Sequence, residues 1–129
     1  MRHLLDAHSL IWALDDPSRL GAGAIAALQA QENELLLSAG TIWELSIKVG
    51  LAKLTLSLPF VHWIEMAIED LELTILPITV KHAGQQADLP FHHRDPFDRL
   101  LAAQALVENV PLVSTDVVFD HYGVTRVWT

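Results

Sequence analysis

The sequence predicts an α/β protein: a mainly parallel five-stranded sheet flanked by helices, in one domain spanning residues 1–129. Short apolar runs alternate with segments of helical periodicity, and strands separated by helices pair in parallel through right-handed crossovers. At 51% hydrophobic residues, the chain can bury one real core. We see no linker-like segment and no internal repeat, so we expect a single domain.

Helices are predicted where apolar residues recur every three or four positions or where strong helix formers cluster. Pro17 stops the first helix, Gly50 ends the third, and Pro59 precedes the fourth. The last helix has the clearest start, because Asp95 and Pro96 suit the N-cap and the first helical position. In chain order, the predicted helices cover residues 9–14, 22–31, 41–49, 60–70, 80–87 and 95–108.

Strands are predicted at short apolar runs that are too short for helices and suit a buried parallel sheet. In chain order they cover residues 4–6, 34–39, 73–76, 110–114 and 124–128. Residues 91–94 (Phe-His-His-Arg) read as a loop, and residues 116–123 as turn-like polar sequence.

This arrangement predicts where a ligand binds. In parallel sheets the carboxyl ends of the strands and the amino ends of the following helices share one edge, which is where ligands bind. Asp6 ends the first strand, Asp116 closes the fourth, and Asp98 opens the long helix. Glu44 is expected in the first turn of the helix after the second strand. We therefore expect these four carboxylates to converge.

Converging carboxylates require a cation. Two of them about 4 Å apart repel by roughly 4 kcal/mol at an effective dielectric constant near 20. The chain has no cysteine and no histidine pair at helical spacing, so oxygen ligands favour Mg²⁺ or Mn²⁺ over zinc. The net charge of −8 opposes nucleic-acid binding by counterion release. A metal-loaded pocket would attract phosphate even though the whole protein does not.

Each acid also has a purely structural interpretation. Thr41 and Glu44 match a capping box, which is the favoured interpretation of Glu44 taken alone. Asp95 is best explained as an N-cap, and Asp6 and Asp116 each fit an Asx turn or N-cap. Capping does not require acids after the first, second and fourth strands to meet at one edge, so we favour a shared site.

Four stretches of the chain, in this order, resemble PIN-domain proteins of the VapC toxin type. The resemblance covers nearly the whole chain and rests on Leu4 to His8, Ser38 to Glu44 with Lys48, Leu89 to Ala105, and Leu112 to Asp116. It implies a PIN-like domain with a parallel sheet and a magnesium-dependent ribonuclease that cleaves RNA phosphodiester bonds. It also implies the toxin of a type II toxin-antitoxin pair, with an antitoxin that masks the site, and a homodimer.

By motif position, the catalytic and metal-binding roles fall on Asp6, Glu44, Asp98 and Asp116. We expect Asp6 and Asp98 to bind the principal ion, and Glu44 and Asp116 to complete its shell or help to hold a second ion. Asp98 is preferred to Asp95 because the family places its acid just before the Leu-Leu-Ala-Ala-Gln-Ala run. The sequence leaves two questions open. It does not say which acid orients the attacking water, or whether Asp95 or Asp120 is an outer-shell ligand. Ser114 stands where the family usually has threonine.

Basic residues near the predicted edge are interpreted conservatively. Lys48, Arg94 and Arg99 are candidates for RNA backbone contacts, but a solvated cation or a local ion pair is the favoured interpretation of each. Adjacent histidines in a loop are more often simply exposed, so we assign no role to His92 or His93.

Other protein classes fit less well. A phosphoacceptor receiver domain needs paired acids after the first strand and a late lysine, and the sequence supplies neither. The serious alternative is a non-catalytic PIN-like binding module whose acidic pocket captures a basic peptide of a partner. No apolar stretch approaches the roughly 20 residues that span a bilayer, and the N-terminus lacks a signal-peptide core. We expect a cytoplasmic protein that does not engage a membrane.

Overall fold

The computed structural model describes residues 1–129 and contains one wholly parallel five-stranded sheet. The strands lie in the order β3-β2-β1-β4-β5, so β1 is central and its neighbours come from distant parts of the chain. Their bounds are β1 Arg2–Leu5, β2 Glu34–Ser38, β3 Thr74–Leu76, β4 Leu112–Val113 and β5 Arg126–Val127. The predicted fold class is confirmed.

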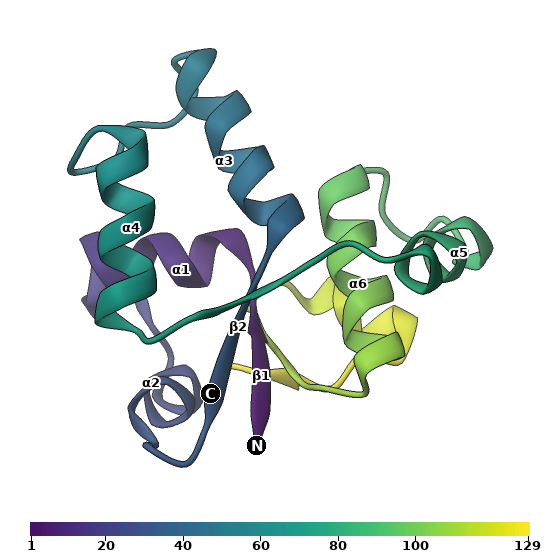
Figure 1. Cartoon of the computed structure of the whole chain (residues 1–129). Helices are drawn as coiled ribbons and strands as arrows, with labels where there is room; N and C mark the ends of the chain where they lie inside the picture. The colour runs from purple at the N-terminus through teal and green to yellow at the C-terminus, as the bar shows by residue number, and fades with distance from the viewer.

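Helices cover both faces of this sheet (Figure 1). Figure 1 shows α1, α2 and α4 on one side and α5 and α6 on the other. The helices are α1 Ala7–Asp15, α2 Ala22–Gln29, α3 Ala39–Gly50, α4 Phe60–Asp70, α5 Val80–Asp88 and α6 Pro96–Glu108, with short 3-10 helices η1 Pro17–Arg19 and η2 Val117–Tyr122. No helix is both long enough and apolar enough to cross a membrane.

Alternation along the strands divides the core into two layers. Leu4 belongs to a cluster that includes residues of α6 and η2, whereas Leu5 belongs to one that includes residues of α1, α2, α3 and α4. Both leucines are fully buried. Successive side chains of a strand point to opposite faces, so a central strand that is apolar on both faces must be covered twice.

Two local expectations are corrected. Helix α3 begins at Ala39 with Ser38 as its N-cap, whose hydroxyl accepts the Gly40 N–H, so the capping box of Thr41 and Glu44 does not form. Glu44 therefore lies in the second turn of α3 and not in the first. The polar segment expected to be turn-like contains η2, whose Phe119 and Tyr122 are buried.

Helices α3 and α6 approach closely at Gly40. A Cβ atom on Gly40 would lie 2.4 Å from Cδ2 of Leu100, a buried residue of α6. Because α3 carries Glu44 and α6 carries Asp98, this contact brings two of the predicted site residues towards each other.

We expect Gly40→Ala to destabilise the fold by about 1–2 kcal/mol, because overpacking at a buried contact outweighs the gain in helix propensity. Gly84→Ala is the matched control, since a Cβ on this glycine of α5 meets nothing within 4 Å. It should stabilise by about 0.5–1 kcal/mol. Urea denaturation measures both, and equal stabilisation by the two variants would contradict the close approach.

Candidate functional site

All four predicted acids line one cavity. Its volume is about 120 Å³, and its lining residues are Asp6, Ala7, His8, Glu44, Lys48, Asp95, Asp98, Thr115, Asp116 and Phe119. It lies where β1 and β4 end and where α1 and α6 begin, which is the edge that the parallel topology predicts. A larger cavity of about 420 Å³ beside His3 contains no acidic residue.

Three of the lining acids cap helices. Asp6 accepts the Ser9 N–H at 2.8 Å, Asp116 accepts the Val118 N–H at 3.0 Å, and Asp95 accepts the Phe97 N–H at 2.8 Å. In each case the capping atom is Oδ1. Capping and convergence therefore coexist, because each cap leaves Oδ2 of the same carboxylate available.

Neighbouring hydroxyl groups fix the backbone around two of these acids. Ser9 Oγ donates to the Val113 carbonyl at 2.9 Å and so ties the start of α1 to β4. Ser114 Oγ accepts the Asp116 N–H at 3.0 Å. The serine that replaces the family's usual threonine thus orients Asp116 through its hydroxyl.

Glu44 is a buried acid of α3, with an exposed fraction of 3%. Its Oε2 accepts a hydrogen bond of 2.7 Å from Lys48 Nζ, one helical turn later. This hydrogen bond is the largest cause of the raised pKa of Lys48. Oε1 of Glu44 is buried without a hydrogen-bond partner. A buried carboxylate oxygen without a partner is costly, and a cation bound in the cavity would satisfy it.

Asp98 shows the electrostatic consequence of this crowding. Burial, followed by the negative charges of Asp95, Glu44, Asp6 and Asp116, raises the pKa of Asp98 from 3.8 to about 7. The structure therefore disfavours the ionised form that a metal ligand needs. A divalent cation would reverse this balance, because it favours the deprotonated carboxylate.

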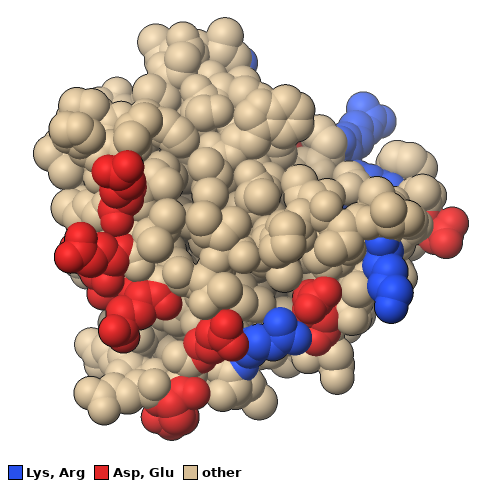
Figure 2. Space-filling model, viewed as in Figure 1, with Lys and Arg blue, Asp and Glu red and all other residues tan.

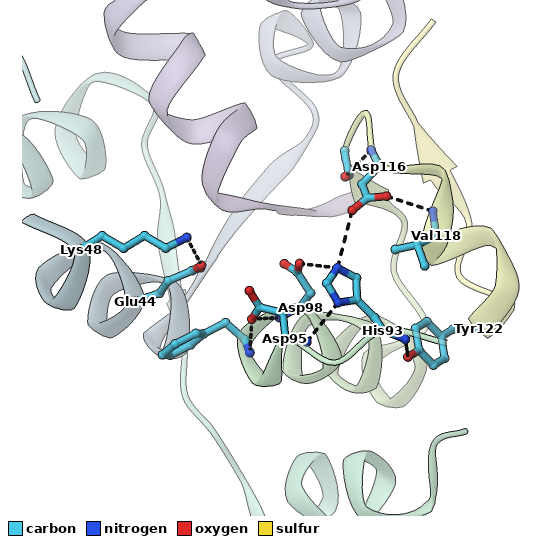
Figure 3. Close-up of polar contacts among 10 residues, drawn as sticks. Glu44, Lys48, His93, Asp95, Asp98, Asp116, Val118 and Tyr122 are labelled. Carbon is cyan, nitrogen blue, oxygen red and sulfur yellow. Dashed lines mark hydrogen bonds and ion pairs between the residues drawn. The ribbon is translucent and has the colours of Figure 1, made fainter. Parts of the chain in front are cut away.

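His93 is a site residue that sequence reasoning missed (Figure 3). Its Nε2 lies 3.0 Å from Asp98 Oδ2 and 3.8 Å from Asp116 Oδ2. Ligand atoms of these three residues all lie within 4.8 Å of one another. The sequence held one signal, which is the position of His93 two residues before the N-cap that opens the helix of Asp98. The exposed His92 instead packs its ring near Tyr122.

Of the basic residues, Lys48 confirms the conservative interpretation as a local ion pair, whereas Arg99 is neither a solvated cation nor part of an ion pair. Lys48 lines the cavity but pairs with Glu44. Arg99 is buried and donates to the carbonyl groups of Gln86, Leu89 and Pro90, so it holds the loop before α6. Asp120, considered as an outer-shell ligand, pairs with Arg126 instead and does not line the cavity.

The donor set fits a hard divalent cation. The acidic residues that line the cavity offer carboxylate oxygens, and one buried oxygen, Oε1 of Glu44, has no protein partner. Oxygen ligands of this kind suit Mg²⁺ or Mn²⁺. Burial and the neighbouring negative charges, which together disfavour ionised Asp98, are a second sign that the cavity suits a positive charge.

Comparison with known proteins decides the family. The family model of the PIN domain matches residues 3–124. The chain belongs to the PIN-domain family. This PIN-domain chain is also 30% identical over 114 residues to Ribonuclease VapC22 of Mycobacterium tuberculosis (strain ATCC 25618 / H37Rv), covering 88% of this chain and 85% of that protein. The resemblance to VapC-type PIN domains is thereby confirmed.

Solved structures show the same fold. The VapBC2 structure from Rickettsia felis, bound to a DNA fragment from their promoter, matches with a TM-score of 0.77 and 18% identity over 100% of both chains. VapBC-1 from nontypeable Haemophilus influenzae matches with a TM-score of 0.68 and 18% identity over 98% of this chain and 96% of that one. FitAcB from Neisseria gonorrhoeae matches with a TM-score of 0.66 and 22% identity over 96% of this chain and 95% of that one.

The pKa of Asp98 predicts a pH-dependent stability of the metal-free protein. Folding raises this pKa above its ordinary value of 3.8 to about 7, so the folded state binds more protons than the unfolded state between these values. Stability should therefore fall as the pH rises through this window and then level off.

Asp98→Asn should remove this fall, about 2–3 kcal/mol between pH 5 and pH 8, because the amide does not ionise. Thermal denaturation in EDTA between pH 5 and pH 8 measures it. Glu65→Gln, at an exposed position of α4, is the control and should follow the wild-type profile. Parallel profiles for wild type and Asp98→Asn would contradict the raised pKa.

Proposed function

We propose that this PIN-domain chain is a Mg²⁺- or Mn²⁺-dependent endoribonuclease and the toxin of a type II toxin-antitoxin pair. The observation that carries the proposal is the single cavity lined by Asp6, Glu44, Asp98 and Asp116, in a chain similar to a ribonuclease. The raised pKa of Asp98 and the unpaired Oε1 of Glu44 support a cation requirement at this cavity.

The metal ligands are proposed to be Asp6, Glu44, Asp98 and Asp116. Asp6 and Asp98 come from the starts of α1 and α6 and supply the principal contacts, with Glu44 and Asp116 completing the shell. A bound divalent ion would supply Lewis-acid stabilisation of the negative charge that develops on phosphate oxygens during hydrolysis.

The remaining chemistry is assigned to groups of the chain. Oε1 of Glu44 has no partner, and Oδ2 of Asp116 is not used in capping, so either oxygen can accept a hydrogen bond from the attacking water. Lys48 brings the cavity's only Lys or Arg charge and can contact an incoming phosphate. Positioning of the water and phosphate would give the in-line geometry that phosphodiester hydrolysis needs.

The antitoxin is proposed to mask this same cavity. Its acids are complementary to a basic side chain, and an arginine can bind a carboxylate through two parallel hydrogen bonds. The similarity of the fold to structures named VapBC is consistent with such a partner. A non-catalytic module that captures a basic peptide would use the same charges, so activity is what separates the two functions.

A homodimer is proposed to form through an uncharged hollow beside the site. This hollow, of about 400 Å³, is lined by Gly40, Trp43, Ile78, Gln86, Pro96, Phe97 and Leu100. Figure 2 shows that the face crossed by the segment between α4 and α5 is largely uncharged, with acidic and basic side chains along its margins. Two copies of a chain with a net charge of −8 can meet here without placing like charges together.

Asp6→Asn should reduce RNA cleavage at least about 100-fold, since it removes a proposed ligand charge. Purified protein free of antitoxin is incubated with RNA and Mg²⁺ or Mn²⁺, and EDTA should abolish cleavage. Asp70→Asn, at an exposed position of α4, is the control and should cleave like wild type. Cleavage that persists in EDTA, or equal cleavage by Asp6→Asn, would defeat the catalytic assignment.

Ile78→Asp should weaken self-association by at least about 10-fold, because it buries a charge at the proposed interface. Ile78 is 48% exposed, so the fold should tolerate the change. Val61→Asp, at a position of α4 that is 62% exposed, is the control. Sedimentation velocity at tens of micromolar should show wild type and the control at twice 14.3 kDa. A monomeric wild type would contradict the dimer.

A further inference from the structure

Two hydrogen bonds hold His93. Its backbone N–H donates to Tyr122 Oη at 2.8 Å, and its ring Nδ1 accepts the Asp95 N–H at 3.0 Å. The backbone is therefore anchored by a residue of η2 and the ring by the N-cap of α6. Nε2 of this anchored ring lies 3.0 Å from Asp98 Oδ2 and 3.8 Å from Asp116 Oδ2, beside both carboxylates (Figure 3).

The Asp95 N–H determines which ring nitrogen carries the hydrogen. A nitrogen that accepts a hydrogen bond presents its lone pair, so Nδ1 is unprotonated and the ring hydrogen is on Nε2. An imidazole ligates a metal through the lone pair of an unprotonated nitrogen. Ligation through Nε2 would move the hydrogen to Nδ1, where it would oppose the Asp95 N–H. Short distances to two acids thus do not make His93 a ligand.

The position of the ring relative to the cavity agrees with this. Asp98 and Asp116 line the cavity, and His93 does not. Its Nε2 approaches Oδ2 of Asp98 and Oδ2 of Asp116 from outside the cavity lining. We propose that His93 is a positioning residue whose Nε2–H lies beside these two carboxylates and lowers the repulsion between them, and that it does not bind the ion itself. This inference rests on the metal site proposed above.

A neutral N–H donor suits this role. It lowers the repulsion between Asp98 and Asp116 and still leaves the cavity negative enough to attract a divalent cation. Groups that orient ligands in this way typically change metal affinity by about 10–100-fold when they are removed. The hydrogen bond from the Asp95 N–H fixes the orientation of the ring and therefore the position of its Nε2–H. The acceptor at Nδ1 and the donor at Nε2 can be tested separately by substitutions that keep only one of them.

Mn²⁺ binding, measured by calorimetry without RNA, tests the proposal. His93→Ala should weaken binding about 10–100-fold. His93→Gln keeps a donor at the reach of Nε2 and should recover part of the affinity. His93→Asn keeps an acceptor for the Asp95 N–H, but its amide donor does not extend to the position of Nε2, so it should not recover the affinity. His92→Ala, which alters the neighbouring loop histidine, should bind like wild type.

Pulsed electron paramagnetic resonance of the Mn²⁺-loaded protein supplies a second readout. Because His8 also lines the cavity, the wild type is compared with His93→Ala, and the two are expected to give the same ¹⁴N signal. A directly coordinated ¹⁴N coupling that is present in the wild type and lost in His93→Ala would overturn the proposal by making His93 a ligand. The proposal would also be overturned if His93→Ala bound Mn²⁺ as tightly as wild type or more tightly, or if His93→Asn recovered as much affinity as His93→Gln. The nuclease proposal would stand in either case. A wild type that binds no Mn²⁺ would overturn both.

Discussion

Repulsion among carboxylates collected at one sheet edge is the constraint on which the rest of this structure depends. Strands β1 and β4 are parallel neighbours, so the acids that follow them, Asp6 and Asp116, leave the sheet at the same edge. Helices α3 and α6 add Glu44 and Asp98 from either side of the close contact at Gly40. Burial and the negative charges of the neighbouring acids together raise the pKa of Asp98 to about 7, which is the electrostatic consequence of collecting these groups in one place.

The chain limits this repulsion with dipoles more than with full positive charges. Asp6, Asp95 and Asp116 each accept a backbone N–H at the start of a helix, where the partial positive charge favours a carboxylate. Only Lys48 brings a Lys or Arg charge to the cavity. The acids that cap helices are thus among the acids that form the site. Helix capping and a shared site are not mutually exclusive.

Much of the fold could be predicted because buried parallel strands and amphipathic helices leave strong local patterns, such as the run that became β2. The position of Glu44 in its helix could not be predicted. Both Ser38 and Thr41 can cap a helix, and the choice depends on where β2 ends, which its pairing of Ser38 with Leu76 of β3 decides. The role of His93 depends on Tyr122, far along the chain in a 3-10 helix that the polar sequence did not predict.

The short range of exposed charges reconciles an acidic protein with the anionic substrate proposed for it. Screening at physiological ionic strength limits exposed charges to about 8 Å, so acids at distant margins have little effect on a phosphate at the cavity. The acids that line the cavity do repel a phosphate there, and they outnumber the single ammonium group of Lys48. The charge that a phosphate meets is therefore determined by the cations the cavity contains. Under the proposed function, cation binding and RNA binding would therefore be linked, each raising the affinity for the other.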